Sequence, residues 1–260
     1  MRTIAIINLK GGVAKTTSSI NIAYILTQRG YKVLLVDNDK QGDSSRMLNR
    51  RSTEKEGIDR IMVDPNPPME ELIQSTEYEN LDVITANFNL LTAQDKARED
   101  RIRSLQDRIK KALKKVSDIY DFCVIDNAPD ISISVINALA AADDVLIPIE
   151  IDDNTVEGMK MLLEQIWEVK DEWNPNLGNV RCLITKYNKY DAAHSQGAEI
   201  VESMYATMRT KIRRSLAVSK STFARMPVAL YSKRSAAAED YQALVEEYLN
   251  MIGGTEHEAI

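Results

Sequence analysis

Short apolar runs alternate along the chain with longer segments in which apolar residues recur every three or four positions. Several runs are apolar almost throughout, which is typical of parallel strands that are covered on both faces. The predicted strands are Thr3–Leu9, Lys32–Val36, Leu81–Thr85, Phe122–Ile125, Val145–Ile149 and Val180–Thr185. The predicted helices are Thr16–Arg29, Ala93–Val116, Thr155–Trp173, Ser195–Met208 and Ala236–Met251. This alternation predicts an α/β fold, with βαβ units forming a mostly parallel, twisted sheet flanked by helices on both faces.

The chain shows no repeat, low-complexity tract or linker that would divide it. We therefore expect a single domain over residues 1–252 and a polar, flexible tail over residues 253–260. Asp64–Pro68 is the clearest loop signal and predicts an excursion between the second and third strands. The helix predicted over Ala93–Val116 carries many lysines and arginines, which we interpret as a solvated helix face.

Composition narrows the class of protein. The net charge of −6 argues against a protein that binds nucleic acid over its whole surface, although it leaves room for a local basic patch. Cys123 and Cys182 lie in predicted strands, so we expect two buried free thiols and no structural zinc site. The sequence has neither a secretory signal nor an apolar stretch of roughly 18 residues, and we expect a cytoplasmic protein.

The segment Lys10–Thr17 reads Lys-Gly-Gly-Val-Ala-Lys-Thr-Thr and lies between a predicted strand and a predicted amphipathic helix. This is the context of a phosphate-binding loop. Glycines let the backbone curl so that several N–H groups point at one anion, and the helix adds its positive N-terminal dipole. Lys15 supplies positive charge to the β and γ phosphates, and the Thr16 hydroxyl is placed to ligate Mg²⁺. The pattern predicts a P-loop NTPase domain that takes ATP and Mg²⁺.

The predicted cofactor-binding residues of the loop are Lys10, Gly11, Gly12, Val13, Ala14, Lys15, Thr16 and Thr17. Ala14 departs from the general pattern, because a glycine usually precedes the lysine. Its methyl group is tolerated if φ is negative there, whereas a positive φ would strain the loop by roughly 1 kcal/mol or more.

Two further predicted strands run into aspartates, the second strand into Asp37 and Asp39 and the fourth into Asp126. In an open parallel sheet, ligands bind at the carboxyl ends of strands, so these carboxylates should lie near the phosphate loop. Asp126 follows the pattern of a Walker B strand, whose carboxylate holds Mg²⁺, often through water. We expect a metal site formed by Thr16, Asp39 and Asp126.

These segments together resemble the ParA family of partition ATPases, part of a wider group with a deviant Walker A motif that also includes MinD. Lys10–Thr16 fits the group's Lys-Gly-Gly-x-x-Lys-Thr. Val36–Asp43 is similar to the family's Val-Asp-x-Asp-Pro-Gln-Gly-Asn, and Tyr120–Pro129 to its Tyr-Asp-x-x-x-x-Asp-x-x-Pro. Similar segments continue through most of the chain at Ile147–Ile149, Val156–Gly158, Ile212–Ser215 and Pro227–Val228.

The resemblance implies roles for individual residues. Lys10 would be the signature lysine, which reaches across a dimer interface to the partner's nucleotide. Lys10, Lys15 and Asp39 would be catalytic, with Asp39 orienting the attacking water. Asp126 would support the metal, and Arg214 would lie near the adenine. The ATP-bound homodimer would bind DNA without sequence preference, and a ParB-like centromere-binding protein would stimulate hydrolysis and release it.

Four positions depart from the family pattern. Ala14 replaces glycine, Lys40 replaces proline, Asp43 replaces asparagine and Arg213 replaces proline before Arg214. They indicate a divergent branch and bear on the rate of hydrolysis more than on the fold.

Non-specific DNA binding needs several basic residues on one face, to displace counterions. Positions 211–234 contain seven basic residues and no Asp or Glu, a local charge asymmetry in an acidic chain. The alternative is an ordinary solvated surface beside the nucleotide site. The candidate DNA contacts are Lys211, Arg213, Lys220, Arg225, Lys233 and Arg234.

The same fold also serves membrane ATPases, iron proteins and regulatory modules. A MinD-like membrane ATPase needs a basic amphipathic helix at the C-terminus, whereas residues 250–260 are short, acidic and broken by glycines, so we expect no membrane partner. A nitrogenase-type iron protein needs cluster-binding cysteines, and Cys123 and Cys182 lie within strands. A nucleotide-dependent regulatory module with little turnover is the remaining alternative, and Asp39 argues against it. We predict a nucleoid-associated DNA-segregation ATPase.

Overall fold

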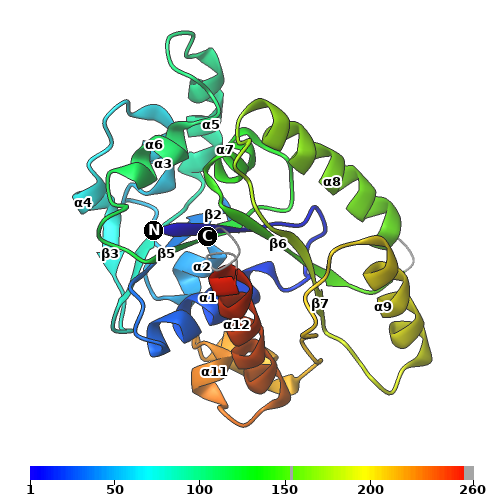
Figure 1. The fold of residues 1–260 in the computed structure, drawn as a ribbon. Helices are drawn as coiled ribbons and strands as arrows, with labels where there is room; N and C mark the ends of the chain where they lie inside the picture. The colour runs from blue at the N-terminus through cyan, green and yellow to red at the C-terminus, as the bar shows by residue number, and fades with distance from the viewer. Residues whose placement is uncertain (153–154, 255–260) are drawn as a thin grey trace.

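A computed structural model describes residues 1–152 and 155–254, which form a central sheet with helices on both faces (Figure 1). In this part of the chain the sheet has seven strands in the order β3-β4-β2-β5-β1-β6-β7. The pairing of β3 with β4 is antiparallel and the remaining pairings are parallel. The strands are β1 (Arg2–Ile6), β2 (Val33–Asn38), β3 (Ile73–Ser75), β4 (Leu81–Ile84), β5 (Phe122–Asn127), β6 (Asp144–Glu150) and β7 (Val180–Thr185).

Alternate residues of the strands face two different cores, because successive side chains of a strand point to opposite faces. Ile4 and Ile6 of β1 pack on one side, whereas Ala5 and Ile7 pack on the other. The first face is covered by α1 (Lys15–Gln28), α2 (Asp43–Met47), α10 (Leu216–Phe223), α11 (Val228–Tyr231) and α12 (Ala236–Gly254). The opposite face is covered by α3 (Ile58–Val63), α4 (Met69–Leu72), α5 (Asn89–Glu99), α6 (Arg108–Lys114), α7 (Ile133–Ala141), α8 (Thr155–Glu172) and α9 (Ala192–Met204).

The six strands that the sequence predicts are confirmed, with shifts of at most three residues at their ends, and the α/β fold class with its mostly parallel sheet is confirmed. Asp64–Pro68 lies between α3 and α4, within the excursion from β2 to β4 as predicted. The sequence does not predict seven of the shorter elements: the edge strand β3 and the helices α2, α3, α4, α7, α10 and α11. Most of these elements have fewer than ten residues and too few turns or alternations for a periodic pattern.

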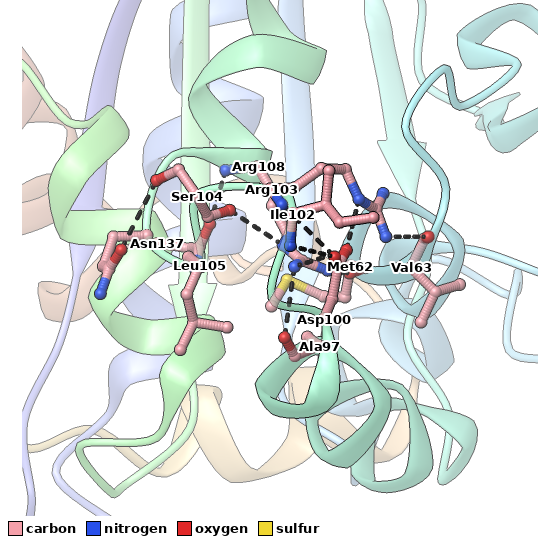
Figure 2. A network of polar contacts seen from close by, with 11 residues as sticks. Met62, Val63, Ala97, Asp100, Ile102, Arg103, Ser104, Leu105, Arg108 and Asn137 are labelled. Carbon is pink, nitrogen blue, oxygen red and sulfur yellow. Dashed lines mark hydrogen bonds and ion pairs between the residues drawn. The ribbon is translucent and has the colours of Figure 1, made fainter.

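The prediction of one continuous helix over Ala93–Val116 is wrong. The chain leaves the helix at Asp100, whose carboxylate accepts hydrogen bonds from the amides of Ile102 (3.0 Å) and Arg103 (3.3 Å) and holds a turn. Arg108 is only 6% exposed, so part of the basic run belongs to the interior and not to a solvated face. Its guanidinium donates to the carbonyl oxygens of Met62, Ala97 and Ser104 and to the Asp100 carboxylate (Figure 2).

The remaining sequence predictions about the chain's ends and cysteines have mixed outcomes. Cys123 and Cys182 are buried free thiols, as predicted. The predicted tail begins at Gly253, but α12 continues through Gly254, and residues 255–260 lie outside the described part of the chain. Within the described residues, no helix is long and apolar enough to cross a membrane.

Candidate functional site

The phosphate loop lies between β1 and α1, at the carboxyl edge of the sheet. Asn8 opens it, because its side-chain oxygen accepts a hydrogen bond from the amide of Lys10 at 2.9 Å and its amide donates to the carbonyl of Pro148 at 2.8 Å. The Thr185 hydroxyl donates to the carbonyl of Val13 at 3.1 Å. Residues from β6 and β7 therefore hold the loop in place from the adjoining strands.

Backbone donors of the loop are free to bind an anion. Within the described residues, the amides of Gly11, Gly12, Lys15, Thr16 and Thr17 donate no hydrogen bond to another group of the chain. The loop borders a pocket of about 400 Å³, within the range of roughly 300–1,000 Å³ that is typical of ligand sites. Unpaired amides at the start of a 14-residue helix form an anion site, and a triphosphate fits both the charge and the space.

Ala14 adopts the left-handed conformation, with φ 70° and ψ 28°. The strain that the sequence makes conditional on a positive φ is therefore present. Gly12 also has a positive φ, of 76°, but glycine adopts it without strain. The loop thus keeps the backbone shape that glycine favours and carries an alanine methyl in it, at a cost of roughly 1–2 kcal/mol.

Lys15 extends into the pocket and is only 8% exposed. Its ammonium donates to the carbonyl oxygen of Lys10 at 2.9 Å. Burial lowers the pKa of the Lys15 ammonium, and nearby carboxylates, Asp126 first among them, oppose that shift. The loop thus carries a buried cation beside its free amides.

Asp126 lies at the end of β5 and is 1% exposed. Its carboxylate accepts hydrogen bonds from the hydroxyls of Ser19 (3.1 Å) and Ser44 (2.6 Å), and the Thr16 hydroxyl lies close by. Burial raises the pKa of Asp126 to about 6, and the bonds from Ser44, Thr16 and Ser19 oppose the shift. The contact between Thr16 and Asp126 brings a hydroxyl and a carboxylate together beside the loop, which are the hard oxygen ligands that Mg²⁺ takes.

Asp37 and Asp39 have different surroundings. Asp37 is fully buried and accepts hydrogen bonds from the Ser45 hydroxyl (2.6 Å) and amide (2.8 Å). Asp39 lines the pocket, and its carboxylate accepts the amide of Gln41 at 2.9 Å in a turn. The structure therefore places Asp39 where a side chain can reach bound ligand, whereas Asp37 holds the start of α2.

Lys10 and Arg214 lie away from the pocket lining. Lys10 is half exposed and forms an ion pair with Asp152. The Arg214 side chain is 73% exposed and its guanidinium lies 4.0 Å from the Glu150 carboxylate. Gly11, Gly12, Ala14–Thr17 and Asp39 line one pocket, whereas Val13 and Asp126 are buried beside it. The roles assigned to all of these residues, and to Lys10 and Arg214, stay predictions.

Other residues at the site escape the sequence analysis. Ser221, Thr222 and Met226 line the pocket from α10 and the turn after it, and Arg46 lines it from α2. Ser19 and Ser44 bind the buried Asp126. One signal for Ser19 exists in the sequence, since it lies on the first turns of the helix that follows the loop; the α10 residues lie some 200 positions away and carry no local signal.

The candidate DNA contacts fall into two groups. Lys211 is paired with Glu202 at 2.5 Å, and Arg213 with Asp240 at 2.7 Å, so carboxylates from other segments neutralise them. The remaining four are exposed and form no ion pair within the described residues: Lys220, Arg225, Lys233 and Arg234. The absence of acids from positions 211–234 of the sequence therefore overstates the basic surface.

Comparison with known sequences gives matches over nearly the whole chain. The family model described as "AAA domain" matches residues 1–179. The sporulation initiation inhibitor protein Soj of Bacillus subtilis is 34% identical over 252 residues, which are 95% of this chain and 97% of that protein. The chromosome partitioning protein ParA of Myxococcus xanthus is 32% identical over 250 residues, covering 95% of this chain and 88% of that protein.

Solved structures match the fold over similar lengths. Cobyrinic acid a,c-diamide synthase of Mycobacterium smegmatis, with a bound ATP analogue and magnesium, has a TM-score of 0.83 and 26% identity, covering 96% of this chain and 95% of that chain. A plasmid partition protein of Borrelia burgdorferi has a TM-score of 0.75 and 24% identity, covering 96% and 98%, and this likeness concerns the fold alone.

Proposed function

Because this chain belongs to the ParA/Soj family, we propose that it is a Mg²⁺-dependent ATPase of DNA segregation. The observation that carries the proposal is the convergence of free amides and Lys15 on one pocket, with the buried Asp126 next to the helix that begins there. The amides and the ammonium suit the negative charge of a nucleoside triphosphate, and the carboxylate suits its metal ion. They do not suit a cationic ligand. ATP is the nucleotide, in agreement with the ATP analogue bound to the similar Mycobacterium smegmatis protein.

The chain's own residues divide the work of phosphoryl transfer. The amides of the phosphate loop and the Lys15 ammonium bind and orient the β and γ phosphates. Thr16 and Asp126 would hold Mg²⁺, which when bound neutralises charge on those phosphates. Asp39 lines the pocket with a carboxylate and orients the attacking water.

We place Lys10 in the partner's site of an ATP-bound homodimer. Phosphoryl transfer needs positive charge near the γ phosphate in its transition state, and a charged side chain supplied in trans meets that need. Lys10 supports this assignment because it is half exposed and does not line the pocket of its own chain. Hydrolysis would thereby depend on dimer formation.

The dimer binds DNA without sequence preference in this proposal, through the exposed Lys220, Arg225, Lys233 and Arg234. Lysine and arginine contacts to phosphate displace counterions and read no sequence. A ParB-like centromere-binding protein stimulates hydrolysis and releases the dimer, and the protein works in the cytoplasm on the nucleoid. The relatives named for chromosome partitioning support this assignment.

DNA binding measured with ATP, with ADP and without nucleotide, over a salt series, tests the proposal. We expect ATP-dependent binding that weakens as salt rises, and its loss in Lys15→Ala. Binding that ignores the nucleotide, or is absent in all three states, would contradict the segregation function. Measurable ATP affinity without any turnover, even with DNA and the partner protein, would favour a regulatory module instead.

A further inference from the structure

A second basic surface lies at the edge of the sheet, away from the C-terminal segment. It is an open groove lined by residues 49–52, Lys55 and the edge strand β3, which Figure 1 shows at one side of the sheet. We name it the β3 groove. Its lining includes Arg50, Arg51 and Lys55 and no Asp or Glu. Glu77 lies at its rim, where its carboxylate accepts a hydrogen bond from the Asn49 side-chain amide at 3.3 Å. A concave surface lined by three cations is the electrostatic footprint of a polyanion site.

The cations of the β3 groove differ in how they are engaged. Arg50 donates to the carbonyl oxygens of Ser75 (2.7 Å) and Asn49 (3.1 Å), and so covers the open edge of β3. Arg51 and Lys55 are exposed, and within the described residues neither forms an ion pair or a side-chain hydrogen bond. Those two charges are therefore free for an external partner.

The loop that carries Arg51 and Lys55 is held in place by a buried side chain, that of Asn87. Asn87 is 3% exposed, and its amide donates to the carbonyl oxygens of Ser52 (3.2 Å) and Lys55 (3.0 Å). The Ser52 hydroxyl accepts the amide of Lys55 at 3.1 Å and closes a turn. A fixed loop loses little entropy when its side chains meet a ligand, which favours binding.

The β3 groove is continuous with the C-terminal basic surface. The Arg225 guanidinium donates to the side-chain oxygen of Asn49 at 3.1 Å, so Arg225 lies at the rim of the groove. Both residues have a positive φ, 53° for Asn49 and 52° for Arg225. Each lies just after the end of a helix, Asn49 after α2 and Arg225 after α10, where such a conformation is common. One strand of a polyanion that touches Arg225 can continue along Arg51 and Lys55.

The β3 groove also touches the turn that carries Asp39. Gly42, in that turn, has a φ of 65°, and a Cβ added to it would lie 3.4 Å from the Arg51 Nε and 2.7 Å from the carbonyl oxygen of Ala86. The Arg51 side chain therefore lies beside the turn that carries Asp39, at the distance of an ordinary van der Waals contact.

We propose that the β3 groove binds the phosphodiester backbone of DNA through Arg51 and Lys55, as a second contact beside the C-terminal basic surface. The inference rests on the proposed DNA binding and adds residues from the N-terminal half of the chain to it. Contacts of this kind depend on charge and not on base sequence.

The test compares the double variant Arg51→Ala/Lys55→Ala with wild type in ATP, using a random-sequence DNA duplex over a salt series. Each lost phosphate contact lowers the slope of log affinity against log salt by about 0.9, so we expect a slope smaller by about 1.8. With equal affinities extrapolated to ~1 M salt, binding at ~0.1 M salt should be about 60-fold weaker. The charge-conserving variant Arg51→Lys/Lys55→Arg should keep the wild-type slope.

A matched control removes two exposed lysines of α6, which form no ion pair with any residue that the structure describes, in Lys110→Ala/Lys114→Ala, and its slope should equal that of wild type. Thermal unfolding and ATP affinity identify a variant that is merely misfolded. Wild-type protein that fails to bind DNA in ATP contradicts the proposed function itself. If wild type binds DNA and the groove variant shows the same slope, the groove does not bind DNA. If the groove variant binds DNA normally but loses partner-stimulated turnover, the groove binds an acidic protein instead. Both results leave the proposed function intact.

Discussion

Asp37 and Asp126 are directly paired residues of adjacent strands β2 and β5, and both carboxyl groups are buried. Burial, with the nearby Asp126 charge second, raises the pKa of Asp37 to about 7. Burial likewise raises the pKa of Asp126 to about 6. Two neighbouring buried carboxyl groups repel each other when both are ionised. A nearby cation, such as Lys15 or a metal ion, is therefore needed if both are to carry a negative charge at neutral pH.

The first prediction concerns the pH dependence of stability. A carboxyl group whose pKa is higher in the folded than in the unfolded protein binds more protons when folded. The free energy of unfolding of the nucleotide-free protein should therefore fall as pH rises from about 4 to about 7, as Asp126 and Asp37 ionise. Asp37→Asn should reduce this fall and be more stable than wild type at about pH 8. Urea unfolding at about pH 5 and about pH 8 measures both.

Carboxyl groups whose pKa is lowered in the folded protein have little effect on the change in the free energy of unfolding between these two pH values. The pKa of Asp100 is lowered to about 2, first by the hydrogen bond from the Ile102 amide, so its stabilising effect is lost only at more acidic pH. The exposed Asp118→Asn serves as the control and should follow the wild-type curve. An Asp37→Asn protein that loses stability between the two pH values as steeply as wild type would contradict the account.

The second prediction concerns Ala14, whose φ of 70° suits glycine. Ala14→Gly should relieve about 1–2 kcal/mol of strain and lose about 0.4–1 kcal/mol through the greater freedom of the unfolded chain, a net gain of up to about 1.6 kcal/mol. Urea unfolding measures it. The control Ala243→Gly, at an exposed position in the middle of α12, should instead cost about 1 kcal/mol, and equal destabilisation of both variants would refute the strain at Ala14.

The third prediction concerns Asp39, which lines the pocket beside the loop. Asp39→Ala should keep ATP affinity and lower kcat by about 100-fold or more, because the attacking water loses its orienting carboxylate. The ATP-bound variant should also stay on DNA. Phosphate-release kinetics and DNA binding measure these properties, with the exposed Asp171→Ala on α8 as control. Hydrolysis by the Asp39 variant at the wild-type rate would remove its assigned role.

The fourth prediction concerns Lys10, which lies outside its own pocket. Lys10→Ala should bind ATP normally but lose about 100-fold or more in DNA- and partner-stimulated turnover, because the transition state lacks a cation in trans. The exposed Lys160→Ala on α8 is the matched control. Mixing Lys10→Ala with Asp39→Ala should restore part of the activity, since a mixed dimer has one site with both residues. Full stimulated turnover by Lys10→Ala alone would show that the lysine takes no part.

Sequence patterns predict the part of the fold whose signals are local. The buried strands read as apolar runs, and the phosphate loop has a strand, two glycines, a lysine and a helix within a short span. The motif also predicts that Asp39 and Asp126 reach the same pocket edge, because parallel strands end on one side of the sheet.

Features that depend on distant contacts could not be predicted in this way. The break at Asp100 follows from Arg108, whose buried guanidinium satisfies carbonyl oxygens of α3 and α5 in Figure 2, and the apolar spacing of Ala93–Val116 carries no sign of it. The positive φ of Ala14 is set by loop geometry that the residue type opposes. Lys211 and Arg213 look free in the sequence because Glu202 and Asp240 approach only in the folded chain.

The most direct test of the central claim is the affinity of the purified protein for ATP with Mg²⁺, measured by calorimetry beside Lys15→Ala. We expect binding by wild type and a loss of about 100-fold or more in Lys15→Ala, because the buried ammonium lies beside the free amides. Lys160→Ala should bind as wild type does. No measurable affinity of the wild type for any nucleotide, or equal affinity of Lys15→Ala, would contradict the account.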